Sequence, residues 1–243
     1  FFSKYLRKPI FPEYTLFVDI EGFPVSYENY LNSFKARGVI GYEVMNSIIQ
    51  VLNYESKMSS EVKPYVKKYC FTSYFTDKLL VPPESFDPVP CIQEFDRINS
   101  EESLWKQDLL YFPTIKSSHR VILSINSLFE RSHFFIPCGT ILGTTQEELV
   151  YNLLSNYSML CKLSKKPFKN VFSFKLQPIG PYPTNCLMHD LGHYLPLYIE
   201  NFEGKAMKSF SVANISKYRR ISAFKLFKST FNKLKEEDLP IPN

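Results

Sequence analysis

Residues 183–204 read PTNCLMHDLGHYLPLYIENFEG, and this stretch decides how the rest of the chain is interpreted. A polar turn leads into Asp190-Leu191-Gly192. An apolar run follows, made of Tyr194, Leu195, Leu197, Tyr198 and Ile199. This pattern predicts a loop that enters the start of a buried helix. The start of a helix offers free backbone N–H groups and a partial positive charge, which an enzyme can use to hold a thiolate.

The composition bounds the class of protein. The chain has 243 residues, of which 44% are hydrophobic and 16% aromatic, so it can bury the core of one large domain or two small ones. The formal net charge of +5 permits an acidic partner and argues against nucleic acid. No apolar run approaches the ~20 residues of a membrane span, so none is predicted.

Cysteine usage and the first residue bear on localisation. The five cysteines are scattered and form no CxxC pair: Cys70, Cys91, Cys138, Cys161 and Cys186. Unpaired thiols indicate an intracellular, reducing compartment, with the nucleus or cytoplasm favoured over an organelle. The chain begins with Phe1 and shows no signal peptide, so we expect a piece of a longer protein that lacks its targeting information.

Periodicity and turn residues predict the secondary structure. The expected elements are a strand at 14–20, helices at 27–36 and 41–54, strands at 108–113, 121–125 and 133–136, a helix at 144–164, and a strand at 168–176. Residues 55–104 contain several prolines and predict a surface connection, with a lid over a substrate site as the alternative. Strands 121–125 and 133–136 are separated by a polar turn and predict a hairpin.

The residues after Gly204 predict a basic amphipathic helix. Its apolar residues recur every three or four positions: Ile215, Tyr218, Ile221, Phe224, Phe227, Phe231 and Leu234. Basic residues lie between them: Lys217, Arg219, Arg220, Lys225, Lys228, Lys233 and Lys235. We expect this helix to pack on its own domain, with a protein partner or an anionic surface as the alternative.

The stretch quoted first resembles the nucleophile segment of the Ulp1/SENP-like cysteine proteases, which process SUMO-type ubiquitin-like proteins. It is most similar to the plant and transposon-associated branch, whose pattern is Gln-x-Asn-x-x-Asp-Cys-Gly, an apolar helix and a Glu-Asn-aromatic-acidic-Gly ending. Here the same frame reads Asn185-x-Leu187-x-x-Asp190-Leu191-Gly192. Leucine therefore stands at the nucleophile position.

A second stretch carries the same resemblance. In the family a His-Trp pair begins one strand of a hairpin and an Asp ends the next. Here Ser118-His119-Arg120 leads into the first strand, and Ile136 ends the second. The resemblance therefore places His119 at the His position, Arg120 at the Trp position and Ile136 at the Asp position.

The resemblance covers about residues 25–204. It implies an α+β, papain-like cysteine protease fold of the Ulp1 type, with N-terminal helices, a central mixed sheet and flanking helices. We accordingly expect an N-terminal arm at 1–24, an Ulp1-like protease domain at 25–204, and the basic amphipathic C-terminal helix at 205–243.

A cysteine protease needs a thiolate, a base, a group that orients the base, and donors for the oxyanion. Of the family's Cys, His, Asp and Gln, only His119 is unchanged. Asn185 keeps a shorter amide at the Gln position, while Leu191 and Ile136 remove the nucleophile and the carboxylate. The resemblance thus implies a catalytically inactive pseudoprotease that serves as a binding or structural module in a larger protein or assembly.

The partners implied are a ubiquitin-like protein and a protein partner for the C-terminal helix, and no cofactor is expected. The first alternative is an active SUMO- or ubiquitin-like-specific peptidase that uses a displaced thiol, Cys186 or Cys138, in place of Leu191. The second is a subunit of a larger assembly that has lost ubiquitin-like recognition.

His189 and His193 have the spacing of a zinc-binding His-Glu-x-x-His helix. Gly192 disfavours a helix interior, and the resemblance places His189 before the helix begins. We therefore expect two polar residues near a degenerate cleft and no metal site.

Overall fold

The computed structural model of the protein describes residues 2–6, 10–60, 66–115, 120–137, 145–177, 182–184 and 186–240. His119, Cys138 and Asn185 lie outside these ranges. The helices are α1 (Phe2–Tyr5), α2 (Tyr27–Phe34), α3 (Tyr42–Ser60), α4 (Ser73–Leu79), α5 (Val89–Glu102), α6 (Gln146–Leu163), α7 (Leu191–Asn201) and α8 (Ile215–Lys228). The strands are β1 (Leu16–Ile20), β2 (Phe23–Ser26), β3 (Lys68–Cys70), β4 (Leu109–Thr114), β5 (Val121–Asn126), β6 (Arg131–Phe135) and β7 (Lys175–Leu176).

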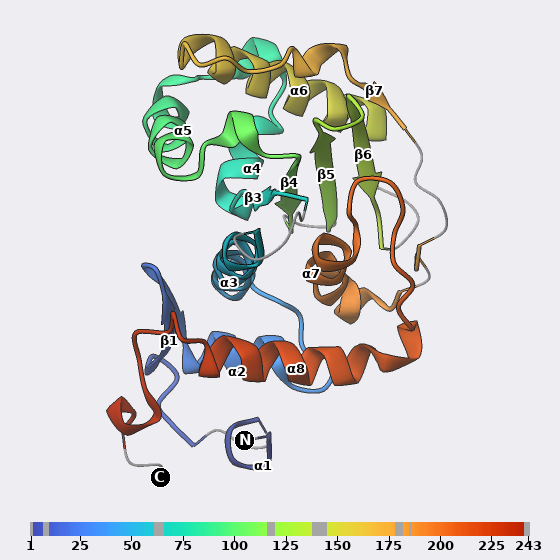
Figure 1. Ribbon diagram of the computed structural model, residues 1–243. Coiled ribbons are helices and arrows are strands. Elements are labelled where there is room, and N and C mark those ends of the chain that lie inside the picture. Colours follow the sequence, from blue (N-terminus) through green and yellow to red (C-terminus); the bar gives the residue numbers. More distant parts are fainter. Residues whose placement is uncertain are drawn as a thin grey trace.

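A five-stranded sheet of order β3-β4-β5-β6-β7 forms the centre of the molecule (Figure 1). Strands β4, β5 and β6 pair antiparallel, whereas β3 runs parallel to β4 and β7 parallel to β6. The expected hairpin is β5–β6, with Ser124 opposite His133. The α+β fold with a central mixed sheet is thus confirmed.

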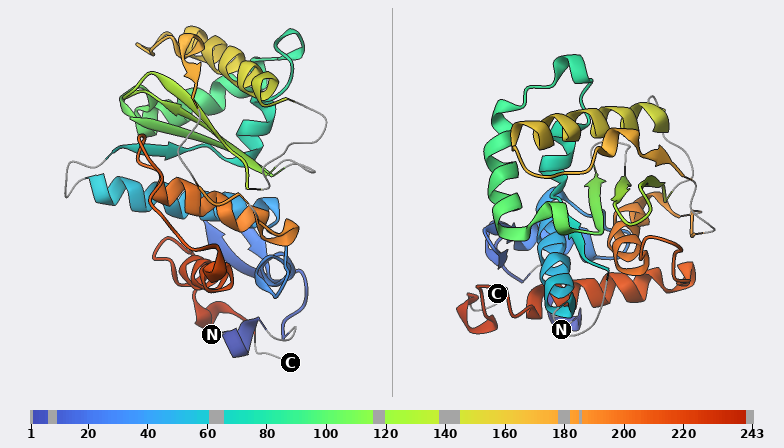
Figure 2. Two further views of the ribbon diagram at one scale, coloured as in Figure 1. Left: turned by 90° about the vertical axis from the view of Figure 1, so that its right-hand side faces the viewer. Right: turned by 45° about the horizontal axis from the view of Figure 1, so that its top comes forward.

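Helices cover both faces of this sheet (Figures 1 and 2). Helices α4, α5 and α6 lie on one face, and α3 and α7 lie side by side on the other. Side chains of β4 alternate between two cores, because successive residues of a strand point to opposite faces. Tyr111 packs in the core of α3 and α7, and Phe112 packs in the core of α4, α5 and α6.

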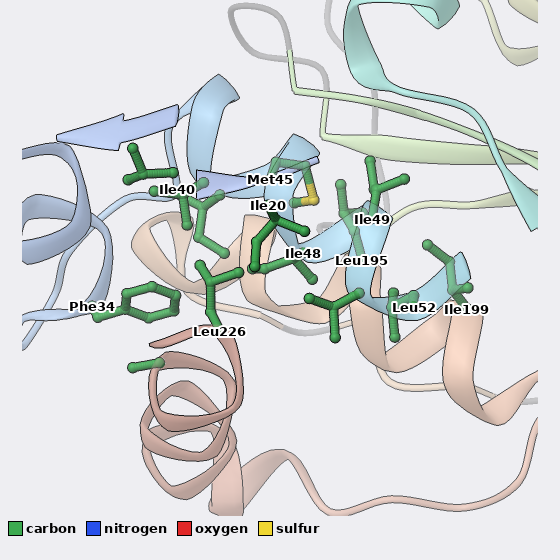
Figure 3. Close-up of a cluster of buried hydrophobic side chains, with 14 of the residues drawn as sticks. Ile20, Phe34, Ile40, Met45, Ile48, Ile49, Leu52, Leu195, Ile199 and Leu226 are labelled. Carbon is green, nitrogen blue, oxygen red and sulfur yellow. The ribbon is translucent and has the colours of Figure 1, made fainter. Parts of the chain in front are cut away.

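A further layer, made of α2, α8 and the β1–β2 hairpin, packs beneath α3 and α7 (Figure 1). Figure 3 shows the apolar cluster between these layers, where Phe34 of α2, Ile48 of α3 and Leu226 of α8 come together. Tyr5 and Phe11 from the N-terminal arm join the same core through ring contacts with Phe17. Residues from both ends of the chain therefore help to build one core.

The expectation for residues 55–104 was wrong. This segment contains α4 and α5, two helices that cover one face of the sheet, rather than a surface connection or lid. Pro90 lies in the first turn of α5, where its missing N–H breaks no helical hydrogen bond. A proline that we interpreted as a helix breaker is therefore tolerated at a helix start.

Two smaller expectations also need correction. The strand expected at 168–176 is reduced to Lys175–Leu176, and a single 3-10 turn occupies Val171–Ser173. The C-terminal helix ends at Lys228, and its inward face carries Arg219, Ala223, Leu226 and Phe227. Ile221 and Phe224 are instead 40% and 47% exposed. A helix turns 100° per residue, so the repeated three-residue steps from 215 to 224 rotate the expected stripe to the opposite side.

No helix in the described part of the chain is both long and apolar enough to span a membrane.

Candidate functional site

Leu191 is the first residue of α7 and follows a 3-10 turn at Met188–Asp190. Its side chain is only 1% exposed. The sequence expectation of a loop that enters the start of a buried helix is met, since every residue from Leu191 to Ile199 is buried. A leucine side chain has no lone pair and no ionisable proton, so this position cannot supply a nucleophile or a base.

Asp190 precedes α7 at the position where a carboxylate would normally cap the helix, yet its side chain caps no backbone N–H. It pairs instead with the Arg219 guanidinium of α8, and both side chains are buried. Arg219 also donates to the backbone carbonyl oxygens of Ser33 at 3.1 Å and Gly38 at 2.6 Å. The Arg219 side chain therefore connects the start of α7 to the end of α2 and to the loop that follows α2.

The sequence analysis did not predict that Arg219 faces inward, because it counted this residue among the basic, solvent-exposed positions of the C-terminal helix. The signal lay in its spacing from Ala223, four residues later, which puts both side chains on one face of the helix.

His193 points into the same region and is 4% exposed. Its Nε2 lies 3.2 Å from the Ser33 carbonyl oxygen, to which it donates, and its buried Nδ1 has no hydrogen-bond partner among the described groups. Burial, together with the charge of Arg219, lowers the pKa of His193 to about 3. His193 is therefore a neutral core residue.

The alternative of a zinc site at His189 and His193 gains no support. His189 lies in the 3-10 turn with its Nε2 3.5 Å from Asp190, whereas His193 is engaged with Ser33. Within the described ranges, no group of three His, Cys, Asp or Glu side chains is arranged to hold a metal ion.

Gly192 lies in a closely packed place at the start of α7. A Cβ atom at this position would lie 3.1 Å from the Cβ of Ile40 and 3.8 Å from the Nε of Arg120. Ile40 and Arg120 therefore lie directly against the residue that follows Leu191. The position that resembles the family's Trp thus places a guanidinium beside the start of α7.

The environment of Arg120 is unusual for an arginine. Its Nε is buried and has no hydrogen-bond partner among the described residues, and burial lowers the pKa of the guanidinium. The nearby Tyr42 phenol acts in the opposite direction and raises the pKa of Arg120. The Tyr42 hydroxyl donates to Asp77 at 2.7 Å. Tyr42 also stacks on Tyr74. Arg120 is therefore part of a polar and aromatic cluster beside α7.

Ile136 follows β6 and is 3% exposed. It packs with the core of α4, α5 and α6, and its backbone N–H donates to the Tyr182 hydroxyl at 3.1 Å. An aliphatic side chain in this core cannot orient an imidazole. His119 and Asn185, the other two expected site residues, lie outside the described residues, so their roles stay predictions.

Among the described residues, none of the four cysteines forms a disulfide bond. Cys70, Cys91 and Cys161 are buried, and burial raises the pKa of each. Cys186 is half-buried and packs against the core of α3 and α7, where it neighbours Tyr194 and Tyr198. Those tyrosines lie one and two turns into α7, whereas Leu191 begins the helix.

Comparison with known proteins gives one kind of match. No protein-family profile and no curated protein sequence matches the chain. Among solved structures, SUMO protease Ulp1 with its catalytic cysteine oxidised to a sulfonic acid aligns with a TM-score of 0.70 at 13% identity, over 94% of this chain and 93% of that chain.

Two further structures agree. The C-terminal Ulp1 protease domain in complex with Smt3, the yeast ortholog of SUMO, aligns with a TM-score of 0.67 at 14% identity, over 94% and 93% of the two chains. The Ulp1-like SUMO protease catalytic domain of Chaetomium thermophilum aligns with a TM-score of 0.61 at 17% identity, over 98% and 91%. The chain therefore has the fold of the Ulp1-type SUMO protease catalytic domain.

Proposed function

We propose that this chain is a catalytically inactive protein of the SUMO-protease fold that binds a ubiquitin-like protein. The observation that carries the proposal is Leu191, buried at the helix start where the resembling proteases place their nucleophile. The partner class is inferred from the aligned Ulp1 structure, whose own partner is Smt3. The absence of a disulfide bond among the described cysteines also favours a reducing, intracellular setting.

The packing of the described thiols argues against the alternative of an active peptidase. Catalysis needs a nucleophile within about 3 Å of its base. Cys70, Cys91 and Cys161 lie in the two cores, and the Cys186 side chain is packed beside the tyrosines of α7. A thiol with a raised pKa is also a poor source of thiolate at neutral pH.

The deciding experiment exposes the protein to SUMO and ubiquitin whose C-termini carry a thiol-reactive warhead, and measures non-covalent binding of unmodified SUMO and ubiquitin in parallel. We expect binding without covalent labelling. The matched ligand control lacks the terminal Gly-Gly and reports whether the tail contributes to binding. Covalent labelling that is lost in Cys186→Ser or Cys138→Ser would overturn the inactive assignment, and the absence of both signals would overturn the binding assignment.

A further inference from the structure

A cavity of about 310 Å³ lies at the opposite end of α7 from Leu191. It is bounded by the second half of α3, by β3, and by the last turn of α7 and the residues after it. Its lining residues are Leu52, Asn53, Glu55, Ser56, Ser59, Val66, Lys68, Cys70, Ile199, Glu200 and Glu203. The volume is at the lower end of the range for small-molecule sites, roughly 300–1,000 Å³.

The inner wall of this cavity is apolar. Leu52 of α3, Cys70 of β3 and Ile199 of α7 are all buried, and Val66 is half-buried beside them. Figure 3 shows Leu52 and Ile199 together at the end of the apolar cluster farthest from Phe34. An alkyl chain that enters the cavity would therefore meet side chains that do not hydrogen-bond to it.

Lys68 brings a cation to this wall. Its Nζ donates to the carbonyl oxygen of Ile199 at 3.0 Å and approaches that of Glu200 at 3.4 Å, both at the end of α7. A lysine ammonium has three N–H donors, so these two acceptors leave one donor without an assigned partner. Among the described residues, no carboxylate lies within ion-pair distance of Lys68.

The acidic residues of the lining are paired with other lysines. Glu55 and Glu200 each contact the Lys225 ammonium, at 3.5 and 3.3 Å, and Glu203 contacts the Lys208 ammonium at 2.5 Å. Lys68 is therefore the charge in the lining that lacks a counter-ion within the described structure. Burial lowers the pKa of Lys68 to about 8, with Lys208 acting in the same direction and Glu203 and Glu200 opposing.

We propose that this cavity binds a small carboxylic acid with an apolar chain, whose carboxylate pairs with the Lys68 ammonium and whose chain packs on Leu52, Val66 and Ile199. A partly buried cation without a counter-ion is costly, and a ligand carboxylate would neutralise it while accepting the remaining N–H. Burial of the alkyl chain adds affinity with every CH₂ group that leaves water, which makes the chain as necessary as the carboxylate. The cavity lies at the end of α7 opposite Leu191, the residue on which the proposed function rests.

The test is calorimetric titration of the full chain with octanoate as the probe, beside acetate, octan-1-ol and octylammonium. We expect octanoate to bind most tightly, because acetate lacks the chain, octanol lacks the charge, and octylammonium places a second cation beside Lys68. Equal affinity for octanoate and octanol, or no octanoate binding, would overturn the proposal.

Variants locate the site. Lys68→Met keeps a side chain of similar length and should weaken octanoate at least about tenfold, as expected for loss of a charge-assisted hydrogen bond, while leaving octanol unchanged. Lys217→Met, on the exposed part of α8, is the matched control and should bind octanoate like the wild type. If Lys68→Met does not fold, Lys68→Gln serves instead. It should weaken octanoate binding in the same way, and an affinity equal to that of the wild type would contradict the proposal.

Proton linkage gives an independent readout. Octanoate is ionised throughout pH 7–9, whereas Lys68, whose pKa is about 8, loses its charge over this range. Octanoate affinity should therefore fall about tenfold between pH 7 and pH 9, and this dependence should vanish in Lys68→Met. An octanoate affinity that falls with pH equally in the wild type and in Lys68→Met would show that the ligand does not pair with Lys68.

Discussion

The Arg219 guanidinium of α8 pairs with the Asp190 carboxylate at the start of α7, and these side chains are only 6% and 7% exposed. The same guanidinium donates hydrogen bonds to the carbonyl oxygens of Ser33, in the last turn of α2, and of Lys35 and Gly38 in the loop that follows. The carboxylate next to Leu191, the position that resembles the family's nucleophile, is therefore a structural group that holds three segments of the chain together. It is not free for chemistry.

Removal of this pair should destabilise the fold. We expect Arg219→Met to lower the free energy of unfolding by about 3–5 kcal/mol, because it leaves the Asp190 carboxylate buried without a counter-ion. Urea denaturation of the variant measures the loss. Lys217→Met, an exposed neighbour on the same helix, is the control and should change stability little. A loss in Arg219→Met no larger than that in the control would show that the ion pair does not hold α7 in place.

His193 should make the protein sensitive to acid. Its pKa is about 3 when folded and about 6.5 when unfolded, so it is neutral in both states above pH 6.5 and contributes nothing there. As the pH falls below 6.5, only the unfolded chain gains a proton, and stability drops by roughly 2 kcal/mol at pH 5.

The comparison is urea denaturation of wild type and His193→Gln at pH 7.5 and pH 5. Glutamine can still donate to the Ser33 carbonyl oxygen but does not titrate, so the variant should lose roughly 2 kcal/mol less than the wild type on acidification. Lys217→Gln, an exposed site on α8 that does not titrate between these two pH values, is the control and should lose as much stability as the wild type. Parallel losses in wild type and His193→Gln would show that His193 is protonated in the folded protein.

The buried thiols should be unreactive in the folded protein. Burial raises the pKa of Cys161 to about 12 and raises those of Cys70 and Cys91 as well, so little thiolate forms at pH 8 and the reagent has no access. Iodoacetamide labelling followed by peptide mass spectrometry should find these three cysteines unmodified in buffer and modified in urea. Rapid labelling of Cys161 without urea would contradict the core assignment.

Restoring the catalytic groups alone should not restore peptidase activity. Arg120 lies against Gly192 at the start of α7, where the resembling proteases carry Trp. We expect Leu191→Cys with Ile136→Asp to leave a fluorogenic SUMO substrate uncleaved, and the addition of Arg120→Trp to produce measurable cleavage. Thermal unfolding of each variant checks that the buried aspartate has not unfolded the domain. Cleavage by the double variant would mean that Arg120 does not obstruct the site.

The sequence predicted the elements whose periodicity is unambiguous. Apolar runs located β4 and β5, and the helices expected at 27–36 and 144–164 correspond to α2 and α6, which the side chains of Ser26 and Thr145 cap. The fold itself was predicted from two short stretches that resemble the protease family. These stretches could be recognised because local sequence signals mark both the start of a buried helix and a hairpin.

The features that the sequence did not predict depend on contacts between distant parts of the chain. The start of α5 was missed because a proline in the first turn of a helix resembles a helix breaker in sequence. The ion pair of Asp190 with Arg219 was missed because a charged residue on an amphipathic helix is usually solvated, and only packing against α2 and α7 turns this one inward.

The residues that follow α8 pair with β1, and this contact between the two ends of the chain has a consequence for synthesis on the ribosome. Asn232 accepts from the backbone N–H of Asp19 at 2.9 Å and pairs with Ile20, so a strand made early is completed by residues made late. A chain that stops before Arg219 carries Asp190 without its partner and leaves the apolar side of α2 and α3 uncovered. We therefore expect the domain to fold only after α8 has been translated, and prematurely terminated products to expose apolar surface that cellular quality control recognises.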